Sequence, residues 1–258
     1  MIKALKETFE YREMLFVLVK RDLKARYKGT FLGYLWTLLM PMLQLLVYTL
    51  IFGSIFGKNI NSFPLFLFAG LLPWNAFSLS VNTSTLSIVK NKHLIKKIYF
   101  PKAVLPIQAV ITACVDQLFG TVIIVIALII FRVGITWHIL LFPLIMILQI
   151  ILFCGFAFVL STLFVKIRDL QYIVNFVVMM LFYMTPIIHD GKNFSKFVTT
   201  IIKLNPLTSL IEAYRNIFLF HQLPSMPGLL YLTIFSIALF IIGLKVFSIR
   251  EKTFAEDI

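Results

Sequence analysis

The sequence has little of the chemistry that enzymes use. Two of its 258 residues are cysteines, and they lie too far apart for a Cys-x-x-Cys motif, so we expect packing residues rather than a redox or metal centre. The four histidines are scattered, with no His-Glu-x-x-His motif, and no Gly-x-Ser-x-Gly motif is present. Asp and Glu together number 11, with no pair suited to glycosyl transfer. These absences argue against an enzyme.

A nucleotide-binding loop is also missing. The nearest approach to Gly-x-x-x-x-Gly-Lys-[Ser/Thr] runs from Gly53 to Asn59, but it has too few residues between its glycines and no hydroxyl after its lysine. A cleavable signal peptide is not expected either. The first thirty residues are highly charged, and the apolar run that follows is too long and bulky for a signal sequence.

Charged residues are absent from long stretches of the chain, which is 60% hydrophobic with a mean hydropathy of +0.96. A membrane-crossing helix needs about 20 apolar residues, and lipid leaves helices or closed barrels as the only stable backbones. Alternating ten-residue segments typical of barrels are absent. We therefore predict an all-α integral membrane protein, a single domain over 1–258, with six transmembrane helices near 31–56, 64–89, 103–131, 139–165, 170–188 and 228–247.

The distribution of positive charge predicts the orientation. If the six crossings are correct, one side of the membrane collects 18 of the 24 Lys and Arg residues and the other side 6. The positive-inside rule then places both termini in the cytoplasm of a multi-pass protein of the cell inner membrane. The net charge of +13 reflects this bias toward anionic membrane lipids, and we expect no nucleic-acid partner.

Two polar segments flank the predicted crossings on the cytoplasmic side. Residues 1–28 carry an apolar stripe at helical spacing, which predicts an amphipathic cytoplasmic interface helix, either a simple anchor or an elbow that also contacts a partner. Residues 90–101 form a short cationic loop between two membrane-length stretches, which suits docking of a motor protein.

On the outer side, residues 188–227 are too polar to cross the membrane and too apolar to be disordered. Helical spacing before and after Asn205-Pro206 predicts two short re-entrant or surface helices, with a plain surface hairpin as the alternative.

Several residues inside or beside the predicted crossings leave more than one interpretation open. Asp116 is either a structural acid paired with a neighbouring group or a proton-coupling site. Gly29/Gly33 and Gly53/Gly57 fit Gly-x-x-x-Gly, which permits close helix approach. Two tryptophans, Trp36 and Trp74, are expected near the membrane interfaces. Some rings either pack in the core or line a conduit for sugars: Tyr34, Tyr48, Phe52, Phe182 and Tyr183.

Three segments together resemble the permease subunits of ABC-2 type transporters. The first runs from Arg21 to Trp36 and is followed by Pro41; the second comprises 94–101 with Leu105-Pro106. The third extends from Asp169 through Thr185-Pro186-Ile187-Ile188 to Asn205-Pro206-Leu207 and Arg215. Within that class, the chain is most similar to the permeases that export O-antigen and other polyprenyl-linked polysaccharides.

The resemblance implies a homodimer paired with two copies of a separate ATP-binding subunit, which would hold ATP and Mg, so that this chain binds no cofactor. It implies a polyprenyl-pyrophosphate-linked polysaccharide as substrate and a coupling helix in 90–101, with Lys92, His93, Leu94, Ile95, Lys96, Lys97, Tyr99 and Phe100. It further implies outer gate helices in 188–224, with Asn205, Pro206 and Arg215. A lateral gate for the lipid headgroup would use Arg21, Lys24, Arg26, Lys28, Gly33, Tyr34 and Trp36, and channel rings would be Tyr48, Phe52, Phe182 and Tyr183.

Alternatives remain for the cargo and for the class of protein. The same machine could export teichoic acid, capsule, a drug or a simple lipid. An ion-coupled secondary transporter would use Asp116, although no inverted repeat is visible. A membrane scaffold would bind partners without ATP-dependent flux.

Overall fold

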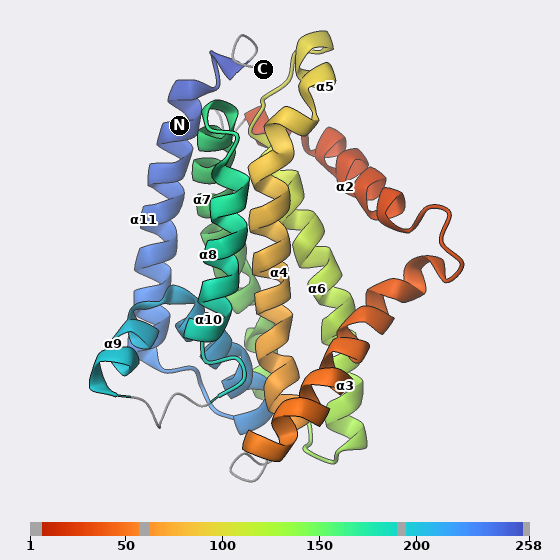
Figure 1. Cartoon of the computed structure of the whole chain (residues 1–258), viewed down its shortest axis with the longest axis vertical. Coiled ribbons are helices and arrows are strands. Elements are labelled where there is room, and N and C mark those ends of the chain that lie inside the picture. The colour runs from red at the N-terminus through yellow and green to blue at the C-terminus, as the bar shows by residue number, and fades with distance from the viewer. Residues whose placement is uncertain (1–6, 57–61, 190–194, 255–258) are drawn as a thin grey trace.

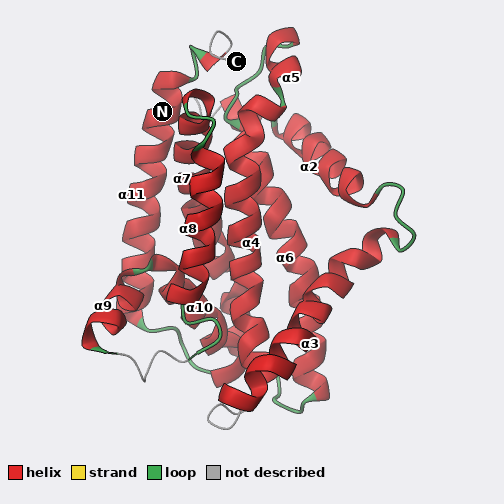
Figure 2. Cartoon of the chain, viewed as in Figure 1, coloured by secondary structure: helices red, strands yellow, loops and turns green. Residues whose placement is uncertain are grey.

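The computed structural model describes residues 7–56, 62–189 and 195–254 as a helical bundle, and these ranges contain no strand (Figures 1 and 2). The predictions for residues 1–6 and 57–61 concern residues outside the described ranges. The helices are α2 (Arg12–Tyr27), α3 (Trp36–Phe56), α4 (Phe63–Lys90), α5 (Lys92–Lys97), α6 (Val104–Ile130), α7 (Phe142–Lys166), α8 (Leu170–Met184), α9 (Lys196–Leu204), α10 (Pro206–Arg215) and α11 (Met226–Arg250).

Four helical stretches within the described ranges are long and apolar enough to cross a membrane. They are Phe63–Lys97, Val104–Ile130, Trp137–Lys166 and Met226–Arg250, while Trp36–Ile51 and Leu170–Met184 are shorter apolar helices. Two predicted boundaries were wrong. The helix predicted from residue 31 begins at Trp36 because Gly29 and Gly33 adopt positive φ angles of +81° and +51° in the preceding turn. The helix predicted to reach 188 ends at Met184, where Thr185 is extended ahead of Pro186.

Helix α4 runs through the centre of the bundle, with α6, α7, α8 and α10 packed around it (Figure 1). It buries apolar side chains on several faces, among them Leu67, Phe68 and Leu71, none more than 1% exposed. A helix that is apolar all round is stable only when other helices or lipid surround it. The bundle is therefore organised around α4.

Helices α7 and α11 approach closely at a pair of glycines. A Cβ on Gly243 would lie 2.6 Å from the carbonyl oxygen of Gly155, and a Cβ on Gly155 would lie 2.9 Å from the backbone nitrogen of Phe240. The Gly29/Gly33 pattern, which permits close helix approach, is not used for one here, because both glycines lie in a turn with nothing described within 4 Å of a Cβ. Small residues thus bring two helices together at a place that the Gly-x-x-x-Gly pattern did not indicate.

A buried polar network crosses the core between α6, α7 and α10. The amide of Gln149, which is fully buried, donates to Gln117 over 2.5 Å, and the hydroxyl of Tyr214 donates to Gln149 over 2.7 Å. Buried amides and hydroxyls are stable only when they are hydrogen-bonded. This network fixes the position of α10 against the long helices.

The polar segments separate to the two ends of the bundle. The α5 turn and the C-terminal end of α11 lie at one end, and α9 lies toward the other (Figure 1). Helix α2 runs obliquely from the first end against α6 and reaches an exposed elbow, where Phe31 contacts little else in the chain. The elbow leads back into α3.

Candidate functional site

The loop between α4 and α6 exposes cations and buries apolar side chains. Ile95 and Phe100 are 8% and 4% exposed, whereas Tyr99 is 89% exposed. The outward side chains are those of Lys92, His93, Lys96, Lys97, Ile98 and Tyr99, and that of Leu94 is half-buried. We name this set the docking face. Ile95 and Phe100, also predicted as coupling residues, are buried instead and anchor the loop to the bundle.

The docking face is tied to the C-terminal end of α11. The backbone N–H of Lys102 donates to Glu251 Oε1 over 2.7 Å, and Lys102 Nζ donates to the Glu251 carbonyl oxygen, also over 2.7 Å. Burial raises the pKa of the Glu251 carboxyl, and the Lys102 N–H and ammonium partly offset that rise. Beside it, the rings of Phe247 and Phe254 meet edge to face at 5.2 Å. This link couples the docking loop to a long helix.

The cations predicted on α2 have different surroundings. Lys24 and Lys28 are exposed. Arg21 donates to Asp22 over 3.1 Å and to Asn91 over 3.3 Å, which connects α2 to the end of α4. Arg26 donates to Asp116 of α6, so its charge already has an anionic partner. Of the four predicted headgroup ligands, Lys24 and Lys28 are exposed, whereas the two arginines already contact a carboxylate.

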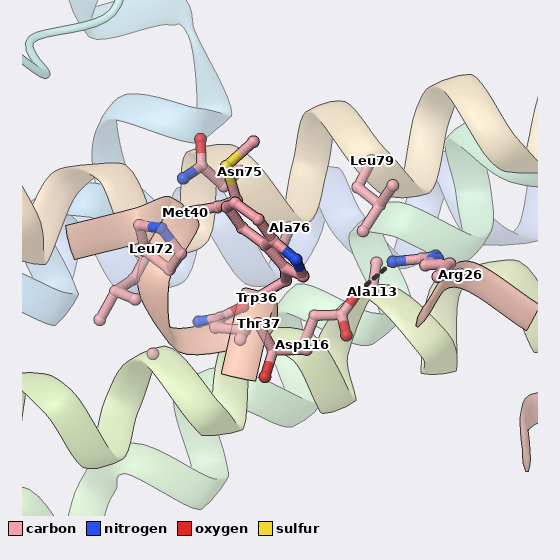
Figure 3. A pocket seen from close by; sticks show the side chains of 13 residues that line it. Arg26, Trp36, Thr37, Met40, Leu72, Asn75, Ala76, Leu79, Ala113 and Asp116 are labelled. Carbon is pink, nitrogen blue, oxygen red and sulfur yellow. Dashed lines mark hydrogen bonds and ion pairs between the residues drawn. The ribbon is translucent and has the colours of Figure 1, made fainter. Parts of the chain in front are cut away.

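The Arg26–Asp116 pair lines a cavity of about 200 Å³ between α2, α3, α4 and α6 (Figure 3). Trp36, at the start of α3, and Asn75, from α4, also face this cavity. Gly33 lies in the turn just before α3, and the side chain of Tyr34 is outside the described part of the structure. The predicted lateral-gate residues are thus distributed over α2, the turn and α3, and Trp36 and Arg26 share one cavity.

Aromatic rings meet where α3, α4 and α8 come together. The ring centroid of Phe182 lies 6.1 Å from that of Tyr48 and 5.5 Å from that of Trp74. Tyr183 stacks edge to face on Phe182 at 5.3 Å and is 66% exposed. The side chain of Phe52 is outside the described part. Trp74 does not belong to an interfacial belt as predicted, because it is 5% exposed and packs inside this cluster.

The break between α9 and α10 is built by Asn205 and Pro206. The Asn205 side chain accepts from Leu207 N at 3.0 Å and donates to the Thr185 hydroxyl at 2.8 Å, and Pro206 occupies the first turn of α10. The predicted pair of short helices therefore appears at the predicted place, although residues 190–194 of that segment lie outside the described part.

Arg215 ends α10 as a buried clamp. Its guanidinium donates to the carbonyls of Pro186 and Ile187 over 2.5 and 2.7 Å and to that of Phe66 over 3.2 Å. It also lies 3.5 Å from the centroid of the Phe66 ring. At 3% exposure, Arg215 holds the chain after α8 against α4. The outer-gate role of Arg215 stays a prediction, and sequence reasoning missed its carbonyl partners.

Comparison with known proteins decides the family. A family model described as ABC-2 type transporter matches residues 13–219, which is most of the chain. The chain belongs to the ABC-2 type transporter family. It is 36% identical, over its whole length and that of the relative, to the O-antigen export system permease protein RfbA of Myxococcus xanthus. A Klebsiella pneumoniae protein of the same name is 35% identical over 95% of this chain and 94% of its own.

A more distant relative is the polysialic acid transport protein KpsM of Escherichia coli. It is 28% identical over 90% of this chain and 91% of its own length. Together with the apolar helices, family membership identifies this ABC-2 chain as a multi-pass membrane permease. Its described residues contain no group of three His, Cys, Asp or Glu side chains that could hold a metal ion.

Proposed function

We propose that this ABC-2 chain is the permease subunit of an ATP-driven exporter that moves a polyprenyl-linked polysaccharide of the O-antigen type from the cytoplasm across the inner membrane. The observation that carries the proposal is similarity over the full chain to permeases named for O-antigen export. The missing nucleotide loop supports a separate ATP-binding subunit, which would supply ATP hydrolysis with Mg.

The proposed membrane arrangement has six crossings, made by α3, α4, α6, α7, α8 and α11, with both termini cytoplasmic. Helix α8 has 15 residues and spans about 22 Å, so this crossing continues through the residues after Met184. The clustering of 18 cations on one side supports the orientation. Residues 1–28 then lie along the cytoplasmic interface and 188–224 form the outer gate region.

The ATP-binding subunits act on the permease through the docking face. Its cations and the exposed Tyr99 suit a complementary surface on each of two ATP-binding subunits, while Ile95 and Phe100 hold the loop rigidly to the bundle. Movement of the partner displaces α5, and the hydrogen bonds between Lys102 and Glu251 pass the displacement to α11. This is the coupling role of residues 90–101.

A second copy of the chain completes the channel. Helix α8 buries only Val174 and Val178 within its own chain, and its outward side chains include Tyr172, Phe176 and Tyr183. Such an apolar face suits contact with lipid or with the same helices of a homodimer partner. The cluster of Tyr48 and Phe182 lies beside this face and offers rings on which sugars can stack.

The lipid end of the substrate approaches at the elbow between α2 and α3. Lys24 and Lys28 are exposed there and can donate charge-assisted hydrogen bonds to a pyrophosphate. An acidic or capsular polymer is the second candidate cargo, which the weaker similarity to the polysialic acid transport protein favours. The ion-coupled alternative finds less support, because Asp116 is paired with Arg26.

The docking role is tested by reversing charge on the docking face. In the double variant Lys96→Glu/Lys97→Glu, copurification with the ATP-binding subunit and lipid-stimulated ATP hydrolysis should each fall about tenfold, as for the loss of rim charge pairs. The matched control is Lys166→Glu at the exposed end of α7, which should leave both unchanged. Unaltered copurification and hydrolysis in the double variant would contradict the docking role.

A further inference from the structure

A second cavity, of about 420 Å³, opens between α2, α4, α6 and α8 at the α5 end of the bundle. Its lining includes five neutral amides, which come from three helices and from the turn before α5: Asn82, Asn91, Gln108, Gln171 and Asn175. We name it the amide cavity. Apolar helices rarely carry so many polar side chains at one place without a use for them.

The amides of the cavity are held in place by one another. Gln171 Nε2 donates to Asn82 Oδ1 over 3.1 Å and to Asn175 Oδ1 over 3.2 Å. Gln108, which is 2% exposed, donates to Asp22 Oδ2 over 2.8 Å. These bonds link α8 to α4 and α6 to α2, so the cavity wall is preorganised before any ligand arrives.

One acceptor in this wall has no partner among the described residues. The Oε1 atom of Gln171 is buried and accepts no hydrogen bond from them, although both protons of the same amide are used by Asn82 and Asn175. A buried acceptor without a donor is unfavourable, so a ligand that supplies an O–H or N–H here is stabilised. A phosphate dianion has no such proton to give, and an acyl chain has no polar group at all.

The charges around the cavity fit a neutral ligand. The carboxylate of Asp22 is held by Arg21 and Gln108, and Arg26 is held by Asp116. Lys90 is the remaining charged side chain of the lining. Amides that both donate and accept, with few uncommitted charges, match the hydroxyl and acetamido groups of a sugar.

We propose that the amide cavity binds a neutral sugar of the lipid-linked cargo, before transport, through Asn82, Gln171 and Asn175. This inference rests on the proposed function and adds a sugar-recognition step to it. The cavity shares Arg26 with the neighbouring lateral-gate cavity. A sugar held there lies beside Arg26, one of the cations predicted for the headgroup, as the first sugar of a lipid-linked saccharide would.

The test uses the complete exporter, permease with its ATP-binding subunit, in lipid nanodiscs. ATP hydrolysis is titrated with undecaprenyl diphosphate and with the same lipid carrying N-acetylglucosamine or galactose. In the wild type, at least one sugar-bearing lipid should act at about tenfold lower concentration than the bare lipid, as for two hydrogen bonds. The near-isosteric double variant Asn82→Leu/Gln171→Met should abolish that difference while its response to the bare lipid stays unchanged.

The control variant is Thr233→Val, which removes a hydroxyl from α11, a helix with no residue in the lining. It should keep the wild-type preference for the sugar. Equal responses of the wild type to all three lipids, or a preference that survives in the double variant, would overturn the sugar site and leave the proposed function standing. If no lipid stimulates the wild type and no polymer is exported, the proposed function fails, and the sugar site with it.

Discussion

Arg26 on α2 donates to the carboxylate of Asp116 on α6, across 90 positions of sequence. The pair joins the oblique helix at the elbow to a long membrane helix, and it neutralises the one acidic residue in the predicted crossings. Asp116 therefore has a structural partner, and α2 is fixed to the bundle by charge as well as by packing.

We expect Asp116→Asn to lower stability without changing the energy source. The substitution leaves Arg26 without an anion at a half-buried position, which should cost about 1–2 kcal/mol and lower the Tm in detergent by a few degrees. ATP-dependent export should persist and remain insensitive to a protonophore.

The control for this pair is Asp22→Asn, which removes a carboxylate that is more exposed on α2. It should lower the Tm less than Asp116→Asn does. Loss of all export in Asp116→Asn, with a normal Tm, would instead support ion coupling.

Glu251, which is hydrogen-bonded to Lys102 next to the docking face, makes the stability of the folded protein depend on pH. Its folded-state pKa is raised, so the folded protein holds this proton more tightly than the unfolded chain does. Its contribution to stability is therefore fully present below the unfolded pKa and is lost as the pH rises through the folded pKa. The Tm of the wild type should therefore fall as the pH rises above 4.5, the reference pKa of Glu, and Glu251→Gln should reduce that fall.

Two substitutions of Glu251 distinguish the effect of its charge from the effect of its hydrogen bond to Lys102. Gln keeps an acceptor for the Lys102 N–H and cannot ionise, so at pH 7 the Tm of Glu251→Gln should equal or exceed that of the wild type, whereas Glu251→Ala should lose about 1–2 kcal/mol. Equal effects of the two substitutions would show that the acceptor is unimportant.

Gly243 should not tolerate a methyl group. A Cβ there meets the backbone carbonyl of Gly155, which no side-chain rotation can relieve, so Gly243→Ala should destabilise the protein by about 1–3 kcal/mol. In Gly228→Ala the new methyl meets the Ser225 hydroxyl, which can rotate away. Thermal unfolding of the two variants should therefore differ, and equal Tm values would contradict the close approach of α7 and α11.

Arg215→Lys should destabilise the chain after α8. A lysine cannot match the fork that reaches the carbonyls of Pro186 and Ile187, and it leaves buried acceptors unsatisfied, at a cost of about 2–4 kcal/mol. The measurement is the denaturation midpoint, with Arg250→Lys at the exposed end of α11 as the matched control. A Tm equal to that of the control would exclude the clamp.

The sequence predicted the four long apolar helices correctly because a membrane helix depends on a local property, a long run with little charge. It also located the break at Asn205-Pro206, where capping and proline chemistry act within a few residues. The partners of Asp116 and Arg215 could not be predicted, because each is fixed by contacts between distant helices. The burial of Trp74 was missed for the same reason.

The docking face could be recognised from the sequence more readily than the amide cavity. The cations of 92–97 lie close together in the sequence and can be recognised there as a cluster. That Ile95, between them, is buried could be seen only in the structure. The amides of Asn82, Gln108 and Gln171 are scattered over three helices, and no spacing rule connects them.

In the proposed exporter, this chain forms the path for the polysaccharide across the membrane, and a separate ATP-binding subunit supplies the energy. The most direct measurement reconstitutes the permease into sealed vesicles, with and without its ATP-binding subunit, and follows accumulation of a lipid-linked polysaccharide. We predict accumulation only when both subunits and hydrolysable ATP are present. Accumulation by the permease alone, without nucleotide, would contradict this account.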